Sequence, residues 1–241
     1  MTSKSLIEHV FGTVPGAEAD EFARWLDEST RFRAFAENYR DKLRKKVSIT
    51  RDPVARSNLW AELGVAYLLA RERRLSVEYE KYGLGMQRAP DFTMHFREHI
   101  LCNVEVTCLQ TPASGSDGKR LLGTICEKLG QLPAGAINVL ALVTPAPAYQ
   151  VEDVTRAMQG ATSWMKPEDE QYLIQRGYRS ARDFRQQAQR LSAVLLRWGG
   201  AAEHSAGLWK NPGARHALPA DLARLLMEDI PAGFSPDPPD V

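Results

Sequence analysis

The most informative segment of the chain is Ala89-Pro90-Asp91-Phe92-Thr93-Met94-His95-Phe96, followed after a short connection by Ile100-Leu101-Cys102-Asn103-Val104-Glu105-Val106-Thr107. Both segments alternate polar and apolar residues with period two, which is typical of half-buried strands. The short connection between them predicts a β-hairpin. If the turn centres on Glu98, Asp91 lies directly opposite Glu105, with their Cβ atoms about 5 Å apart.

Two carboxylates at that separation repel each other unless a proton or a cation lies between them. A hard divalent ion that takes oxygen ligands, Mg²⁺ above all, fits such a pair. The spacing is equally compatible with acidic residues on the solvated face of an ordinary hairpin. The neighbouring segments of the sequence are therefore needed to distinguish a metal site from a solvated surface.

Composition places the chain among ordinary globular proteins. Its 241 residues could form one large domain or two small ones, and 44% hydrophobic and 25% charged residues are typical of a water-soluble protein with a sizeable core. The net charge of +1 gives no overall attraction to an acidic partner, so any such attraction must come from local patches. Three cysteines without CxxC spacing indicate buried thiols in a reducing compartment. We expect a cytoplasmic protein without a membrane segment.

The N-terminal third is predicted to be helical. One helix is expected over residues 17–29, and Thr30 is expected to cap a second helix whose apolar stripe reaches Leu43. The other faces of the second helix and its tail are basic. This basic run is either a solvated face or a contact with a phosphate backbone. Its members are Arg31, Arg33, Arg40, Lys42, Arg44, Lys45, Lys46 and Arg51.

A third helix is expected over residues 53–73, with Pro53 at its start and Glu62 interrupting its apolar surface. A strand over 75–80 and a loop over 81–88 then lead to the hairpin. A polar loop, a helix over 118–132 and a continuous apolar strand over 136–143 follow. The predicted order is therefore helix, three strands, helix, strand.

This order resembles the αβββαβ core of the PD-(D/E)XK nuclease superfamily, the restriction-endonuclease-like fold. Pro90-Asp91 resembles the first half of the family motif, and Glu105-Val106-Thr107 resembles the second half. Glu62 matches the acidic residue that many members carry on the helix before the sheet. The resemblance implies an α/β domain with a mixed sheet flanked by helices and with extra helices at both ends. It covers residues 53–145.

Thr107 departs from the pattern because the family has its lysine at this position. In some members the lysine lies on the following helix, where Lys119 and Lys128 are candidates here. On a helical wheel, Lys128 lies about 70° from the centre of the apolar face and Lys119 about 110° from it. We therefore expect Lys128 to border the face that packs on the sheet and Lys119 to be solvated.

The resemblance implies a nuclease dependent on Mg²⁺ or Mn²⁺. Asp91, Glu105 and the carbonyl of Val106 would bind the metal, Glu62 would complete the acidic cluster through water, and Lys128 would supply the fixed positive charge. The implied partner is nucleic acid, DNA rather than RNA because the superfamily mostly cuts DNA, and a homodimer is compatible with it. The alternative is a catalytically inactive member of the same fold that binds nucleic acid or a protein partner. The threonine at position 107 in place of the lysine favours this alternative.

The last third of the chain extends the same domain. Helices are expected over residues 150–163, 167–175, 180–189 and 219–228, and strands over 191–198 and 208–210. The predicted division is an N-terminal helical extension over 1–52, an α/β domain over 53–230 and a proline-rich flexible tail over 231–241.

Overall fold

The computed structural model describes residues 1–12, 16–81, 89–109, 118–144, 148–162, 167–198 and 205–229. It shows an α/β protein with a six-stranded mixed sheet flanked by helices. The predicted loop over 82–88 and tail over 231–241 lie outside the described residues. Among the described residues, no helix is both long enough and apolar enough to cross a lipid bilayer.

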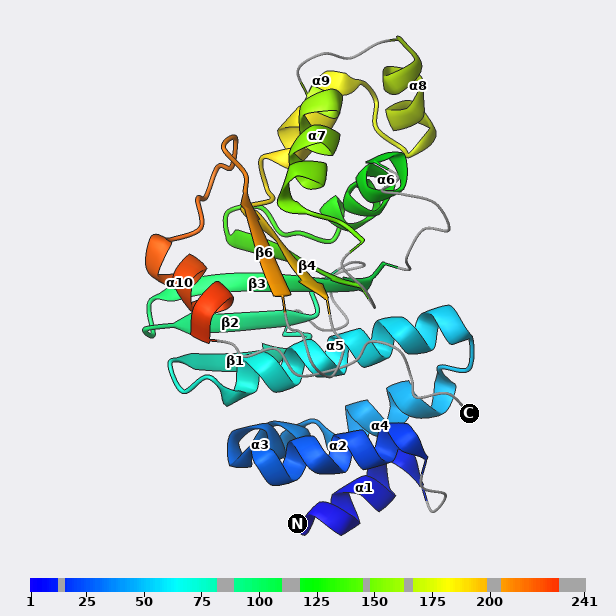
Figure 1. Ribbon diagram of the computed structural model, residues 1–241, viewed down its shortest axis with the longest axis vertical. Helices are drawn as coiled ribbons and strands as arrows, with labels where there is room; N and C mark the ends of the chain where they lie inside the picture. Colours follow the sequence, from blue (N-terminus) through cyan, green and yellow to red (C-terminus); the bar gives the residue numbers. More distant parts are fainter. Residues whose placement is uncertain are drawn as a thin grey trace.

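The strands lie in the sheet in the order of the sequence (Figure 1). The central strands β3, β4 and β5 are parallel to one another, and all other neighbouring pairs are antiparallel. The parallel connections need helical crossovers, which is why helices follow β3 and β4. The strands are β1 (Leu75–Tyr79), β2 (Phe92–Phe96), β3 (Ile100–Cys108), β4 (Ile137–Thr144), β5 (Ala193–Trp198) and β6 (Ser205–Lys210).

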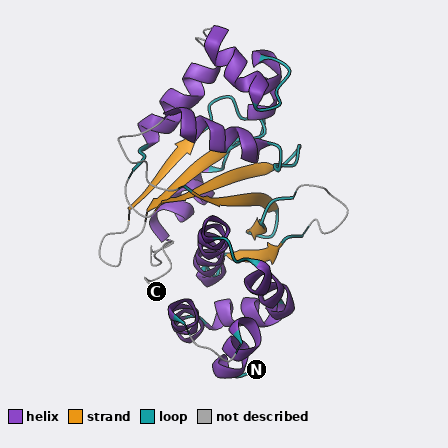
Figure 2. Ribbon diagram, turned by 90° about the vertical axis from the view of Figure 1, so that its right-hand side faces the viewer, coloured by secondary structure: helices purple, strands orange, loops and turns teal. Residues whose placement is uncertain are grey.

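Helices cover both faces of the sheet (Figure 2). On one face lie α5 (Pro53–Arg71) and, beneath it, α1 (Ser3–Phe11), α2 (Ala17–Glu28), α3 (Thr30–Asn38) and α4 (Arg40–Ile49). On the other face lie α6 (Gly118–Leu129), α7 (Val151–Thr162), α8 (Pro167–Gln175) and α9 (Ala181–Ala188). The short α10 (Ala220–Arg224) and the π-helical turn over Leu225–Asp229 join the core of the α5 face.

The α5 helix is the central support of its face. The Asp52 side chain caps it by accepting a hydrogen bond from the Ala55 amide, and Pro53 occupies its first turn. Trp60 and Tyr67 project from it and stack on Trp25 of α2, with ring centroids 4.9 and 5.2 Å apart. The N-terminal helices therefore share one hydrophobic core with α5 and the sheet.

The second predicted helix is wrong in its start and its continuity. Ser29, not Thr30, caps α3 by accepting a hydrogen bond from the Phe32 amide. The helix ends at Asn38, because Tyr39 leaves helical geometry with φ −108° and ψ 14°, and α4 restarts at Arg40. The Tyr39 hydroxyl accepts a hydrogen bond from the Tyr79 amide, so the break lets this side chain cover the edge of β1. The sequence analysis also missed α1.

The predicted hairpin register is confirmed. Phe92 pairs with Val104 and Met94 with Cys102, which is the pairing expected for a turn centred on Glu98. The apolar face of the hairpin packs in the α5 core. Much of its polar face is buried, because Thr93, Asn103 and Glu105 are at most 1% exposed, whereas His95 is partly exposed.

Buried polar side chains link the middle strands across that second face. The Thr93 hydroxyl donates to Asn103 Oδ1, and Asn103 Nδ2 donates to Asn138 Oδ1, both at 3.0 Å. Asn138 Nδ2 in turn shares its hydrogens among the carbonyls of Pro133, Ala136 and Arg190. A buried polar group without a partner costs about 1–3 kcal/mol, so the linked amides fix how β2, β3 and β4 pack.

Replacing both amides should cost less than the two single replacements together. Asn138→Leu removes the hydrogen bonds of Asn138 to Asn103 and to three carbonyls, so we expect a loss of about 2–4 kcal/mol in the free energy of unfolding. In Asn103→Leu/Asn138→Leu both partners of the Asn103–Asn138 bond are replaced, and the loss should fall short of the sum by about 1 kcal/mol. Urea unfolding of the three variants measures this coupling, and strictly additive losses would contradict the link.

Candidate active site

Asp91 and Glu105 meet where β2 begins. Asp91 directly precedes β2, and its Oδ2 accepts a hydrogen bond from the Val106 amide of β3 at 2.8 Å. The N–H and C=O of a strand residue point to the same edge. The Val106 carbonyl therefore faces the edge on which Asp91 lies, as the resemblance requires of a metal ligand.

The Glu105 carboxylate is buried, and only one of its two oxygens accepts a hydrogen bond from a described residue. Its Oε1 accepts a hydrogen bond from Lys128 Nζ of α6 at 2.7 Å, and the residue is 1% exposed. Its Oε2 has no hydrogen-bond partner among the described residues. An orphaned carboxylate oxygen in the protein interior is costly, so this atom is ready to accept a proton or a cation.

Glu62 brings a third carboxylate from α5. The residue is 8% exposed, and its Oε1 binds Lys46 Nζ at 2.7 Å. Its charge acts on both Asp91 and Glu105, so the helix and the hairpin place their acids in one cluster. The predicted residues Asp91, Glu105 and Glu62 thus act on one another electrostatically, and Lys128 contacts Glu105.

Burial and like charge oppose ionisation of this cluster. Burial, followed by the charges of Glu62 and Glu105, raises the pKa of Asp91 well above its ordinary value. Burial also raises the pKa of Glu105, although the ammonium of Lys128 acts against the shift. A cation close to the two carboxylates would favour their ionised forms.

Lys46 is the functional candidate that sequence reasoning missed. Its Nζ binds Glu62 Oε1 and Glu80 Oε1, both at 2.7 Å, and lies 4.8 Å from the centre of the Tyr79 ring. Burial acts to lower the pKa of Lys46, but Glu62 and Glu80 hold it above its ordinary value. Lys42, which lies 3.2 Å from Glu80 Oε2, also points inward. Both lysines lie three positions after an apolar residue of the stripe, Tyr39 or Leu43, and that spacing could have signalled their inward position.

Thr107 stands at the position of the family lysine, and its side chain contacts Asn58 of α5. The Thr107 hydroxyl and the Cys108 amide both donate to Asn58 Oδ1, at 3.3 and 2.8 Å. Thr107 is 7% exposed, so a long charged side chain at this position would have to displace Asn58. The lysine that contacts Glu105 lies on α6.

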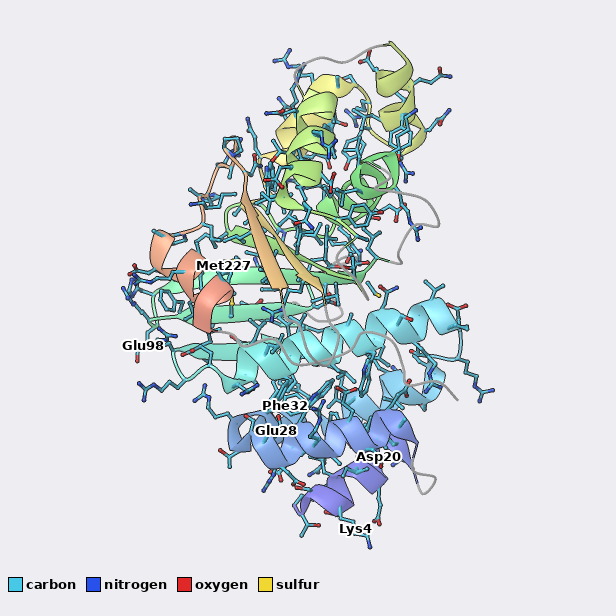
Figure 3. The ribbon with its side chains drawn as sticks, in the orientation of Figure 1. Lys4, Asp20, Glu28, Phe32, Glu98 and Met227 are labelled. Carbon is cyan, nitrogen blue, oxygen red and sulfur yellow. The ribbon has the colours of Figure 1, made fainter. Side chains whose placement is uncertain are left out.

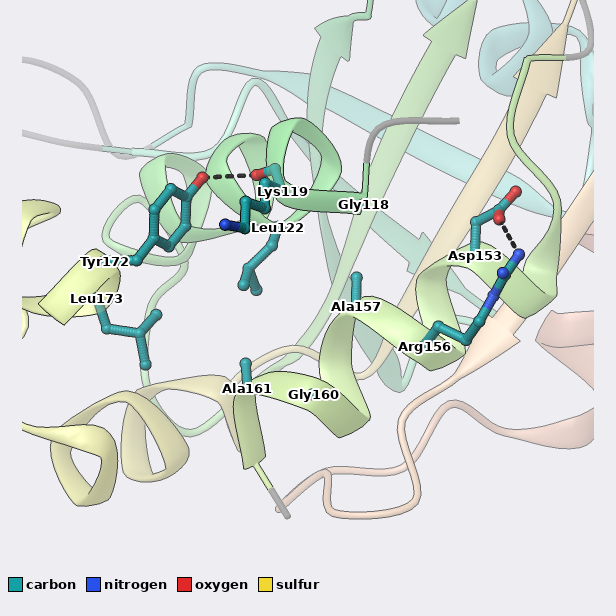
Figure 4. Close-up of a pocket in the computed structure, with 10 residues that line it drawn as sticks. All are labelled: Gly118, Lys119, Leu122, Asp153, Arg156, Ala157, Gly160, Ala161, Tyr172 and Leu173. Carbon is teal, nitrogen blue, oxygen red and sulfur yellow. Dashed lines mark hydrogen bonds and ion pairs between the residues drawn. The ribbon is translucent and has the colours of Figure 1, made fainter. Parts of the chain in front are cut away.

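Lys119 lies elsewhere, as the helical wheel predicts. It is exposed and lines a separate pocket of about 500 Å³ between α6, α7 and α8 (Figure 4). Tyr172 donates a hydrogen bond to the Lys119 carbonyl there, and Gly160 and Ala161 form the opposite wall. The residues that line this pocket include none of the carboxylates of the Asp91–Glu105 cluster.

The donor atoms of the cluster fit Mg²⁺ in kind. Two carboxylates and a backbone carbonyl are hard oxygen ligands, and Mg²⁺ commonly takes one or two carboxylates and keeps several waters. In the described part of the chain, no group of three or more His, Cys, Asp or Glu side chains is gathered tightly enough to hold a metal ion. Glu62 is engaged by Lys46, so a direct metal ligand role for it has no support here.

Comparison of the chain with models of known protein families gave no match, and a search of curated proteins gave none either. The resemblance to the PD-(D/E)XK superfamily therefore rests on the residues and their arrangement alone.

Replacing Asp91 by asparagine should stabilise the protein at neutral pH. A carboxyl whose pKa is raised by folding contributes stability that is fully present below its unfolded pKa and is lost as the pH rises through its folded pKa. Asparagine cannot ionise and can still accept the Val106 hydrogen bond. We expect the melting temperature in EDTA to rise by about 2–4 °C at pH 7.5, the effect of roughly 1 kcal/mol in a chain of this size, and the gain to vanish near pH 4.

Asp183→Asn is the matched control, because hydrogen bonds from the Arg179 amide and Gln187 lower the pKa of Asp183. The sign is reversed for this group, and the variant should be less stable at neutral pH and equal to the wild type in acid. A destabilised Asp91→Asn protein at pH 7.5 would show that the cluster is not under charge repulsion.

Proposed function

We propose that this protein is a nuclease that depends on a divalent metal and hydrolyses phosphodiester bonds of nucleic acid, DNA rather than RNA. The observation that carries the proposal is the contact of Lys128 Nζ with Glu105 Oε1 at 2.7 Å. It supplies, from α6, the ammonium group that the sequence lacks at Thr107. A buried acid pair beside a fixed lysine is the arrangement that phosphodiester hydrolysis uses to stabilise developing charge.

The order of the elements supports a PD-(D/E)XK core. The chain runs α5, β1, β2, β3, α6, β4, which is the predicted helix, three strands, helix and strand. The α5 helix carries Glu62 to the start of β2, and α6 carries Lys128 to β3. Glu62 lies on the helix before the sheet and Glu105 lies on β3, Asp91 directly precedes β2, and the lysine lies on α6, which supports the proposal.

The chain's own residues would divide the work as follows. Asp91, Glu105 and the Val106 carbonyl would hold Mg²⁺ or Mn²⁺, which when bound lowers the pKa of a coordinated water and offsets phosphate charge. The Val106 amide fixes the Asp91 carboxylate. Lys128, anchored on Glu105, places its ammonium where negative charge would develop on the phosphate. Lys46 holds Glu62 at the rim of the cluster.

A non-catalytic module with the same fold is the second candidate. It is favoured by Asn58, which accepts from both the Thr107 hydroxyl and the Cys108 amide and so closes the position of the family lysine. In this alternative, the pairs of Lys46 with Glu62 and of Lys128 with Glu105 are structural and satisfy the buried acids. Such a protein would bind nucleic acid or a protein partner without cutting it.

Metal binding should be lost with either acid of the pair. Glu105→Gln and Asp91→Asn each remove a charged ligand, and calorimetric titration with Mn²⁺ should show no binding where the wild type binds. Glu127→Gln is the matched control, because this exposed glutamate of the same helix pairs with Arg176 and should leave Mn²⁺ binding unchanged. A wild-type protein that binds no Mn²⁺ up to millimolar concentration would contradict the proposed site.

The two lysines of α6 separate the nuclease from the binding module. Lys128→Ala should lower the rate of DNA cleavage about 100-fold, the usual scale for losing one fixed stabilising group, whereas Lys119→Ala should change it little. Cleavage of labelled DNA and RNA under saturating Mg²⁺ measures both. Equal effects of the two substitutions would refute the role of Lys128. A wild type that binds Mn²⁺ but cuts neither substrate would favour the non-catalytic alternative.

A further inference from the structure

An arginine-lined hollow lies at the other end of the hairpin from the carboxylates. It has a volume of about 710 Å³ and is lined by four arginines and His95, against one glutamate, Glu98. The arginines come from three places: Arg31 from α3, Arg73 and Arg74 from the turn before β1, and Arg97 from the turn after β2. The five residues of β2 lie between Asp91 and Arg97, and six steps of about 3.3 Å along the strand place the hollow about 20 Å from the carboxylates.

Two of the four arginines in the hollow, Arg31 and Arg73, form no salt bridge with a residue that the structure describes. Arg31 donates to the carbonyls of Ala70 and Leu75, which hold its guanidinium in place without cancelling its charge. Arg73 is exposed and forms no salt bridge within the described part of the chain. Of the other two, Arg74 pairs with Glu72, and Arg97 pairs with Asp221 at 2.8 Å in an exposed contact. Such fixed and exposed guanidinium groups are well suited to phosphate, which they bind through paired N–H groups.

The turn that presents Arg97 is strained. Arg97 and Glu98 both have left-handed backbone conformations, with φ of 49° and 65°, where hairpins usually carry asparagine or glycine. The Arg97 guanidinium lies 4.9 Å from the centre of the Phe96 ring, which fixes its position at the rim. Figure 3 shows Glu98 at the outer tip of this turn. Strained backbone of this kind is concentrated at functional sites.

A second hollow extends the first along the free edge of β1. It has a volume of about 360 Å³, shares Arg31, Leu75 and Ser76 with the first, and ends at Tyr39. The Leu75 carbonyl and the Tyr79 amide face this edge, so the N–H and C=O of Val77 between them face it too. Tyr39 contacts Tyr79, over whose ring Lys46 lies. The two hollows therefore lead from the arginines toward the carboxylate cluster.

We propose that the arginine-lined hollow binds phosphate groups of a nucleic-acid strand, whose continuation reaches the Asp91–Glu105 cluster along the edge of β1. The choice of nucleic acid as the source of the phosphates rests on the proposed function, because free polyphosphate offers the same chemistry. Binding in the hollow requires neither the metal nor hydrolysis. The two proposals can therefore fail separately.

The test uses Arg73→Gln/Arg97→Gln, which removes two exposed charges from the hollow and spares the carbonyl contacts of Arg31. The matched control is Arg179→Gln/Arg182→Gln, which removes two exposed charges at α9, on the other face of the sheet. Fluorescence anisotropy of a labelled single-stranded DNA of about 20 nucleotides, in EDTA and across a salt series, gives the affinity and its salt dependence. Circular dichroism checks that each variant is folded.

We expect the hollow variant to bind DNA about 10-fold more weakly and the slope of log K against log salt to fall by about 1.4, the value for two lost phosphate contacts on a single strand. The control should keep the wild-type slope. Asp221→Asn, which frees Arg97 from its carboxylate, should tighten binding. Equal losses in the hollow variant and the control would overturn the proposal, as would undiminished DNA affinity beside weakened binding of tripolyphosphate. If the hollow variant binds DNA about 10-fold more weakly but the wild type shows no nuclease activity, the proposed phosphate site stands and the proposed hydrolysis is refuted.

Discussion

The structure around the site depends on how carboxylates are kept inside the protein. Asp91, Glu105 and Glu62 are brought together by a strand start, a central strand and a helix, and burial opposes the ionisation of the first two. Desolvating such charges costs more than a single exposed ion pair can return, so each needs a close partner. Lys128 supplies one from the α6 face and Lys46 another from the α4 side. The helices on both faces of the sheet are thereby tied to one cluster.

The pairing of the hairpin strands and the inward position of Lys128 on α6 could be predicted from local sequence rules. A turn centred on Glu98 gave the pairing of Phe92 with Val104, and alternation of polar and apolar residues gave the face of the sheet on which each side chain lies. The helical wheel separated Lys128 from Lys119, because both lie on one regular helix with a clear apolar face. These features depend on the period of a single element and can be read from it.

Contacts between distant elements could not be predicted in the same way. Lys46 meets Glu62 and Glu80, and which carboxylates it would find depended on the break at Tyr39 and the packing of α4 beside β1. The bond of Thr107 to Asn58 joins residues that no periodic pattern connects. The arginine-lined hollow likewise gathers residues from α3, the turn before β1 and the turn after β2. In each case tertiary packing, and not local propensity, sets the partner.

The net charge of the carboxylates and lysines around Asp91 and Glu105 indicates which ligands could bind there. Glu62, Glu80, Asp91 and Glu105 face the ammonium groups of Lys42, Lys46 and Lys128, so full ionisation leaves the cluster one unit negative. A proton on Asp91, whose pKa is raised, makes the cluster neutral. A divalent cation in place of that proton would make it one unit positive. A phosphodiester carries a single negative charge, so its arrival would restore neutrality in a buried site where uncompensated charge is costly.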